Sequence, residues 1–309
     1  MLYHKNIRIF LLIVAGVLSF IQETLAGNVK VVTTTTNLAA IAKEIGGDKI
    51  DVESMSQASE DPHFVDPKPN LLLLLNKADV LLVNGLDLEI GWLPPLIRGA
   101  RNQKIQVGAP GYFDASKYIV LQEIHTGAVD RSMGDIHMEG NPHFLLDGKA
   151  VIVVAQAFAK RLQELDKPNK LFYQQQSKKM TDELLHVVKT QREKFAKLPA
   201  TKRCLVSYHQ SLIYLLLWLD LHQVATVEPK PGISPDPGHV AEVLQTMRNS
   251  QCQTLVQEEY YPQHTSETLT KLANAKFVTI PGGVRIDKNQ SYKMFLEQVT
   301  DKIYDAIQN

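Results

Sequence analysis

The chain has 309 residues, of which 44% are hydrophobic and 21% are charged, and this composition excludes a fibrous or a disordered protein. Its 33 basic and 33 acidic residues give a formal net charge of +0, which argues against nucleic-acid binding as the main task. The two cysteines, Cys204 and Cys252, exclude a disulfide-dense scaffold and a cysteine-based zinc finger.

The first residues have the layout of a secretory signal. Lys5 and Arg8 precede an apolar stretch over residues 9–21, and the small residue Ala26 comes directly before Gly27. The stretch is shorter than the roughly 18 to 20 residues that a membrane-spanning helix needs. We therefore expect residues 1–26 to be a signal peptide that is cleaved near Ala26, which predicts a periplasmic protein. No cysteine lies near this site, so a lipid anchor is not expected.

Strand and helix patterns alternate through the first half of the expected mature chain. Apolar residues at helical spacing predict helices that start near Asn37, Pro69 and Leu86. β-Branched and apolar runs predict strands at residues 29–35, 51–55, 79–83 and 105–107. This alternation is typical of a parallel sheet with helices on both faces, so residues 27–166 are expected to form an N-terminal α/β lobe.

A long helix is expected after this lobe. A helical pattern at residues 150–165 ends in a Lys-Pro-Asn turn, and residues 170–197 then continue without Gly or Pro. At ~1.5 Å per residue, this stretch would be a rod of about 40 Å. Its apolar residues fall on one stripe, which would suit either a coiled-coil dimer or a strut between two lobes. We favour a long rigid linking helix over residues 167–199, because a fresh α/β pattern begins directly after it.

The last third of the chain repeats the α/β pattern. Strands are predicted at residues 203–207, 254–258 and 276–280, and helices at residues 210–219, 266–273 and 292–307. Residues 200–309 are therefore expected to form a C-terminal α/β lobe, with a cleft between the two lobes. Cys204 and Cys252 stand at the starts of predicted strands, so an oxidising compartment would permit a disulfide between them. The sequence leaves that pairing open.

Three of the ten histidines lie at predicted strand ends or beside a predicted helix start. His63 and His143 share an Asx-Pro-His-Phe pattern, in which proline stiffens the turn that presents the imidazole. His209 follows the strand that ends at residue 207. Each one alone would suit a capping or core histidine, but the repeated turn and the shared placement favour three ligands of one metal ion. Asp66 or Asp147, a few residues further on, could accept the second ring N–H of its histidine.

Five short segments together are specific to one family of proteins. They are Asp-Pro-His at 61–63, Asn-Pro-His at 141–143, Ser-Tyr-His-Gln at 207–210 with Tyr214, Glu-Pro-Lys-Pro-Gly-Ile at 228–233, and Glu-Glu-Tyr-Tyr at 258–261. From about Asn28 to its end, the sequence resembles the metal-binding solute-binding proteins of zinc and manganese ABC importers, the zinc-uptake A type. The resemblance implies two α/β lobes bridged by a long rigid helix, with one transition metal in the cleft held by His63, His143 and His209.

The same resemblance implies a carrier and not an enzyme. Such a carrier would act as a monomer and deliver its metal to an ABC permease that is driven by a separate ATPase. Many members carry an aspartate after the last strand of the C-terminal lobe, but here Ile280 occupies that neighbourhood. Water, Glu258, His137 or, least favoured, Asp287 could therefore complete the site. Three imidazoles without two carboxylates favour Zn²⁺ over Mn²⁺, which prefers hard oxygen ligands.

Other functions remain open at this point. The segment with His125, Asp135, His137 and Glu139 could capture metal and pass it to His143, or it could be an ordinary solvated loop. A secreted zinc hydrolase is the main rival, because three histidines with an open fourth position also describe catalytic zinc. No His-Glu-x-x-His segment is present, which argues against a hydrolase. A surface adhesin with a structural metal is a third possibility.

Overall fold

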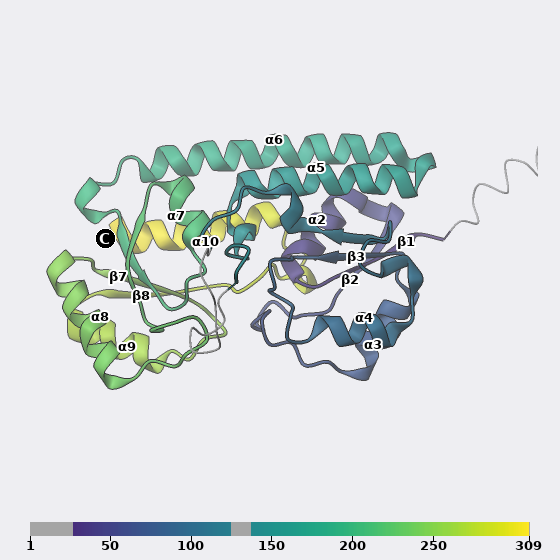
Figure 1. Cartoon of the computed structure of the whole chain (residues 1–309). Coiled ribbons are helices and arrows are strands. Elements are labelled where there is room, and N and C mark those ends of the chain that lie inside the picture. The colour runs from purple at the N-terminus through teal and green to yellow at the C-terminus, as the bar shows by residue number, and fades with distance from the viewer. Residues whose placement is uncertain (1–26, 125–136, 309) are drawn as a thin grey trace, which may run out of the picture.

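The computed structural model describes residues 27–124 and 137–308, so the expected signal peptide and the segment with His125 and Asp135 lie outside it. Two four-stranded parallel sheets, one in each half of the chain, lie side by side, and a long helix runs along one edge of both (Figure 1). The expected two-lobed α/β fold is confirmed. Within the described residues, none of the helices has the length and apolar character that crossing a membrane requires.

The sheet of the N-terminal lobe has the strand order β2-β1-β3-β4, with every neighbouring pair parallel. Its elements are β1 (Val29–Thr33), β2 (Ile50–Ser54), β3 (Val80–Val83) and β4 (Tyr112–Asp114), with helices α2 (Thr36–Gly46), α3 (Pro69–Lys77), α4 (Leu93–Ala100) and α5 (Gly148–Leu165). Alternate residues of β1 enter different cores. Val31 packs in the core that includes α2 and α5, whereas Val32 packs in the core that includes α3 and α4. Helices therefore cover both faces of the sheet, as the run of apolar strand residues predicts.

The C-terminal lobe repeats this topology with the order β6-β5-β7-β8, again parallel throughout. Its elements are β5 (Cys204–Ser207), β6 (His222–Thr226), β7 (Thr254–Glu258) and β8 (Lys276–Ile280), with helices α7 (Ile213–Leu219), α8 (Pro237–Ser250), α9 (His264–Ala273) and α10 (Tyr292–Gln308). In both sheets the first strand lies inside the sheet, between the second and the third. The loops that follow these strands consequently open toward the same region between the lobes.

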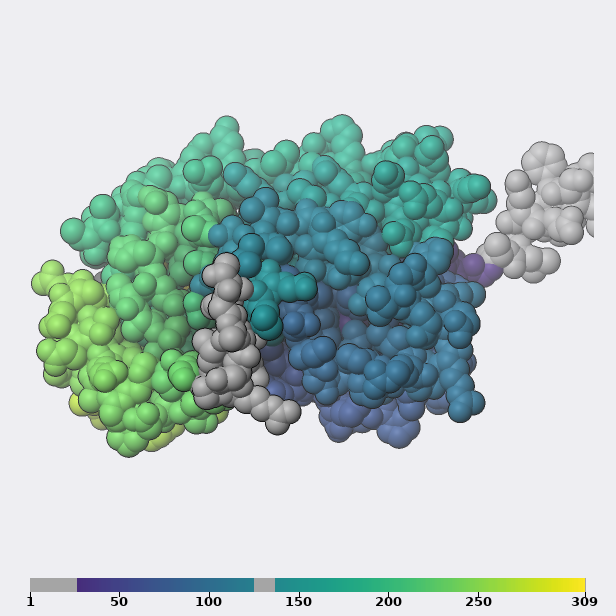
Figure 2. Space-filling view, viewed as in Figure 1, coloured from purple at the N-terminus to yellow at the C-terminus, as the bar shows by residue number. Residues whose placement is uncertain are grey.

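The long helix α6 (Lys170–Phe195) contacts elements of both lobes. It pairs with α5 and α2 in the first half of the chain and with α7 and α10 in the second. Tyr173, near its start, and Phe195, at its end, are both fully buried in one continuous apolar core. The space-filling view shows α6 covering one long edge of both lobes (Figure 2). Its apolar stripe is thus buried within the chain, as expected for a strut between lobes.

Hydrogen bonds also join the last third of the chain to the N-terminal lobe. The backbone N–H of Val284 donates to the side-chain oxygen of Asn37 at 2.9 Å, and the N–H of Tyr292 donates to the Glu44 carboxylate at 2.6 Å. The Tyr292 hydroxyl donates to the Leu145 carbonyl at 2.6 Å and is buried. The start of α10 is therefore fixed to α2 and to the segment that precedes α5.

The predicted strand at residues 105–107 is wrong. The structure has a short 3-10 turn at Gln103–Ile105 instead, and the edge strand β4 follows it. The side chain of Asn102 sets this turn, because its oxygen accepts from the N–H of Lys104 at 3.0 Å and its amide donates to the carbonyls of Leu75 and Ala78. A local side-chain contact of this kind competes with strand pairing. Strand β6 was not predicted.

A disulfide joins Cys204 and Cys252, which settles the pairing that the sequence left open. Cys204 begins β5, and Cys252 lies shortly before the neighbouring strand β7. Both residues are buried. Their sequence separation of 48 means that the bond closes a long loop in the unfolded chain.

Replacing Cys204 and Cys252 together with alanine is expected to lower the free energy of unfolding by roughly 3 kcal/mol, because the unfolded chain regains loop freedom. Urea unfolding of the metal-free protein measures this change, and the chemically reduced wild type serves as the matched control. An unchanged urea midpoint in both samples would show that the bond contributes nothing to stability.

Candidate metal centre

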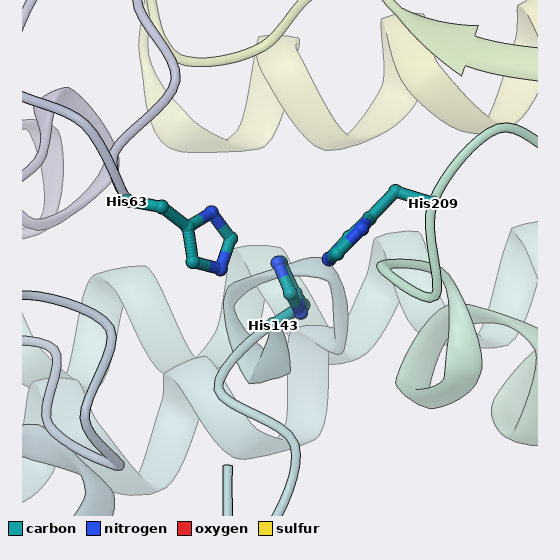
Figure 3. A group of neighbouring side chains, drawn as sticks. All are labelled: His63, His143 and His209. Atoms are coloured by element: carbon teal, nitrogen blue, oxygen red, sulfur yellow. The ribbon is translucent and has the colours of Figure 1, made fainter. Parts of the chain in front are cut away.

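Three histidines from three separate segments meet between the lobes (Figure 3). His63 lies in the loop between β2 and α3, His143 directly precedes the 3-10 turn Phe144–Leu146 before α5, and His209 follows β5. One potential ligand atom from each residue lies within 4.8 Å of the others. These are the three histidines that the sequence singled out, and the structure brings all of them together.

The rings are close and mostly shielded from solvent. The ring centroids of His63, His143 and His209 are 5.1 to 5.5 Å apart in each pair. His63 is 8% exposed and His209 is 4% exposed. Among the described residues, the Nε2 atoms of His63 and His143 are buried without a hydrogen-bond partner. A buried polar atom that lacks a partner requires an explanation, and a bound ion is one that fits these atoms.

The other ring nitrogen, Nδ1, has a hydrogen-bond partner in each case. His63 Nδ1 lies 2.7 Å from the Asp61 carboxylate, His143 Nδ1 lies 2.9 Å from the Asn141 side-chain oxygen, and His209 Nδ1 lies 2.7 Å from the Glu228 carboxylate. An oxygen acceptor at Nδ1 places the proton there and leaves the Nε2 lone pair available to a metal. The structure thus holds the three rings in the tautomer that a ligand needs.

The expectation that Asp66 or Asp147 fills this role is wrong. Asp66 is exposed, and Asp147 caps α5 by accepting the N–H of Lys149 at 2.8 Å. For His63 and His143 the acceptor is instead the Asx residue two positions before the histidine, and its oxygen also accepts the backbone N–H of that histidine. Asx side chains commonly bond to the backbone two residues on, so the Asx-Pro-His pattern itself carried this signal.

Burial and neighbouring charge set the protonation of two of the histidines. Burial, together with the nearby rings of His209, His63 and His137, holds the pKa of His143 well below its usual range, so this ring is neutral at neutral pH. Burial also disfavours the charged form of His209. The hydrogen bond and the charge of Glu228 outweigh that effect, and the pKa of His209 is raised.

Of the candidates for a fourth ligand, Glu258 and His137 lie near the three histidines and Asp287 does not. Glu258 ends β7, is buried and accepts a hydrogen bond from the Ser211 hydroxyl. The His137 ring centroid lies 5.4 Å from that of His63. Ile280 is the register partner of Glu258 on β8 and is buried, so an apolar side chain occupies the position where the resemblance led us to expect an aspartate. Asp287 is exposed on a 3-10 turn and does not belong to the histidine cluster.

A small cavity lies next to His143. Its volume is about 60 Å³, and residues of both lobes line it, among them Thr35, Asn84, His143, Glu258 and Ile280. Burial raises the pKa of Glu258, although the Ser211 hydrogen bond and the nearby His209 oppose this shift. The cavity is large enough for ordered water, and Thr35, Asn84 and Glu258 offer it hydrogen-bond partners.

A buried carboxylate that the sequence did not reveal supports the turn of His143. Glu89 accepts the Thr34 hydroxyl at 2.5 Å and the backbone N–H groups of Asn84 at 2.7 Å and Gly85 at 3.2 Å. The Asn84 side chain then donates to the carbonyl of Pro142 at 2.9 Å, directly before His143. Burial raises the pKa of Glu89 to about 7, and these hydrogen bonds only partly oppose the shift.

Comparison with known proteins agrees with this architecture. Residues 31–306 match the family described as zinc-uptake complex component A, periplasmic (ZnuA). The manganese ABC transporter substrate-binding lipoprotein PsaA of Streptococcus pneumoniae (serotype 4) is 26% identical over 301 residues, which cover 93% of this chain and 92% of PsaA. The crystal structure of ZnuA matches with a TM-score of 0.76 at 21% identity, covering 91% of this chain and 99% of ZnuA. A manganese-bound periplasmic metal-binding protein from Candidatus Liberibacter asiaticus gives a TM-score of 0.75 at 18% identity, covering 90% and 99%.

The fold and the histidine cluster between its lobes define a two-lobed solute-binding protein. The match over residues 31–306 shows that the chain belongs to the zinc-uptake complex component A family, the metal-binding substrate-binding components of ABC importers. Members of this family are transport components and not enzymes, so the hydrolase alternative is wrong. The family acts outside the cytoplasm.

Glu89 is expected to make stability depend on pH. A carboxyl with a raised pKa in the folded protein stabilises it fully below the unfolded value, here 4.5, and this stability is lost as pH rises through about 7. The loss for metal-free wild type amounts to about 3 kcal/mol. Glu89→Gln lacks the titration, so the difference in unfolding free energy between the two proteins should change over this pH range.

Urea unfolding of both metal-free proteins between pH 4 and pH 8 measures this difference, and Glu139→Gln, which alters an exposed carboxylate, is the control. A constant difference between wild type and Glu89→Gln over the whole range would contradict the prediction.

Proposed function

We propose that this protein captures Zn²⁺ between its two lobes and delivers it to an ABC permease that is driven by a separate ATPase. One observation carries the proposal: three imidazoles from distant segments converge, with two buried Nε2 atoms unpartnered within the described residues. The family's description as a zinc-uptake component supports the transport role. In this proposal the ligands are the Nε2 atoms of His63, His143 and His209.

Zinc is the proposed metal because of the chemistry of the ligands. Neutral imidazole suits Zn²⁺, whereas Mn²⁺ prefers carboxylate and water oxygens. PsaA is named as a manganese protein, and a structural neighbour binds manganese, so fold similarity alone does not select the metal. The buried Ile280 removes one oxygen ligand that many members of the resembled family have. Manganese therefore remains the alternative cargo for the same site.

His137 is the proposed fourth ligand. Its ring lies beside that of His63, and it contributes to the lowered pKa of His143, so it belongs to the same cluster of imidazoles. Glu258 already accepts the Ser211 hydroxyl. In this proposal Glu258 stays next to the ion and offsets part of its charge, without binding it.

The proposed mature protein is periplasmic and monomeric. Residues 1–26 form the signal peptide, cleaved near Ala26, and the mature chain consists of an N-terminal lobe (27–166), a linking helix (167–199) and a C-terminal lobe (200–309). PsaA is named a lipoprotein, but here no cysteine lies near Ala26 that could carry a lipid. The proposed partner in the membrane is the permease.

Loss of single histidines tests the site. Purified wild type should contain about one zinc per chain, and His63→Ala, His143→Ala and His209→Ala should each lower zinc affinity by about 100-fold or more. Elemental analysis and calorimetric titration measure both quantities, and competition with Mn²⁺ tests the choice of metal. His222→Ala, at an exposed position on β6, is the matched control. A wild type that takes up no zinc, or three variants that keep it, would refute the proposal.

A separate comparison identifies the fourth ligand. X-ray absorption of the zinc-loaded protein should count four nitrogen ligands in wild type and in Glu258→Gln, but one imidazole fewer in His137→Ala. Zinc affinity of His137→Ala should fall by about 10-fold or more, since one metal bond is replaced by water. If the spectrum changes in Glu258→Gln and not in His137→Ala, the carboxylate is the ligand.

A further inference from the structure

One carboxylate bridges the two segments that carry His143 and His209. One oxygen of Glu123 accepts the side-chain amide of Asn141 at 2.8 Å, and the other accepts the side-chain amide of Gln210 at 2.5 Å. Asn141 fixes the ring of His143, and Gln210 directly follows His209. Glu123 therefore contacts a neighbour of one ligand in each lobe.

Further hydrogen bonds hold this bridge in place. The Asn141 amide also donates to the carbonyl of Gln210 at 2.7 Å, which joins the two lobes a second time. The Tyr214 hydroxyl on α7 donates to the carbonyl of Asn141 at 2.9 Å and accepts the N–H of Gln122 at 3.1 Å. The Gln122 carbonyl accepts the N–H of Asn141 at 2.8 Å. Residues 122 and 123 are thus tied to both ligand segments by backbone and side chain.

The backbone of Glu123 is held in an unfavourable conformation. Its φ is 55°, in the left-handed region that residues other than glycine, asparagine and aspartate seldom adopt. Such a conformation persists only where surrounding contacts determine it, and it is found most often at functional sites. At Glu123 the two side-chain hydrogen bonds supply those contacts.

We propose that Glu123 is a positioning residue that keeps the His143 and His209 segments together and thereby slows the release of bound metal. This inference rests on the proposed function, since it assumes that His143 and His209 bind the same ion. Hydrogen bonds to a carboxylate are among the stronger ones in proteins. The bond to Asn141 holds Glu123 against the His143 segment of its own lobe, and the bond to Gln210 crosses to the other lobe. Removing them lets one ligand move away while the other still holds the ion.

The test is the rate at which zinc leaves the loaded protein when an excess of a coloured chelator is mixed in. Glu123→Ala is expected to release zinc about 10-fold faster than wild type, on the basis of the usual strength of hydrogen bonds to a charged group. Zinc stoichiometry should stay at one per chain. Glu193→Ala, which removes an exposed carboxylate on α6, should release zinc within about 2-fold of wild type.

A double-mutant cycle shows whether Glu123 slows zinc release through its hydrogen bond to Gln210 or independently of that residue. Gln210→Ala removes the same bridge from the other side, so the double variant Glu123→Ala/Gln210→Ala should release zinc no faster than the faster single variant. Additive effects, or wild-type release by Glu123→Ala, would overturn the inference. If Glu123→Ala fails to fold, Glu123→Gln and Gln210→Ala take its place: faster release by both supports the bridge, and wild-type release by both overturns it.

Zinc binding by the wild-type protein distinguishes a failure of the proposed function from a failure of the role proposed for Glu123. If it takes up no zinc, the proposed function fails and this inference fails with it. If it binds one zinc and the variants release it at the wild-type rate, only the role of Glu123 is refuted.

Discussion

The arrangement of the three histidines depends on the hydrogen bond that each ring makes through Nδ1. An oxygen acceptor at Nδ1 fixes the tautomer and the plane of the ring, and the lone pairs of Nε2 then face a common point. The acceptors differ in charge, since Asp61 and Glu228 are carboxylates and Asn141 is an amide. The protein thus places two carboxylates behind the three imidazoles, an arrangement that suits a divalent cation in a buried site.

Two repeated α/β units explain why the ligands meet. In each unit the first strand is internal, and the loops that follow the strands face the other unit, so the loops after β2 and β5 can reach one point. The turn of His143 comes from the connection to α5 and receives support from Glu89 through Asn84. The positions of the three histidines therefore depend on buried polar groups in both halves of the chain, among them Glu89 and Glu228.

Sequence reasoning succeeded where a residue type has a strong local effect. Strands β7 and β8 were predicted with their observed bounds, because their apolar runs are bounded by turn residues, and the prolines before His63 and His143 indicated stiff turns. It failed where the outcome depends on contacts distant in sequence. The partly exposed β6 has no clear pattern, and nothing local shows that Glu89 is buried. The acceptors of the His63 and His143 ring N–H were predicted wrongly, because carboxylates that follow each histidine were preferred to Asp61 and Asn141 within the turns.

The continuous packing of α6 against both lobes has a mechanical consequence. A straight helix resists bending, since a kink requires proline, a bulge or an inserted group in its hydrogen-bond ladder, and residues 170–195 contain no proline. The lobes consequently lack a flexible crossover about which they could swing widely apart. A wide separation of the lobes would require α6 to bend or to lose its packing against one of them.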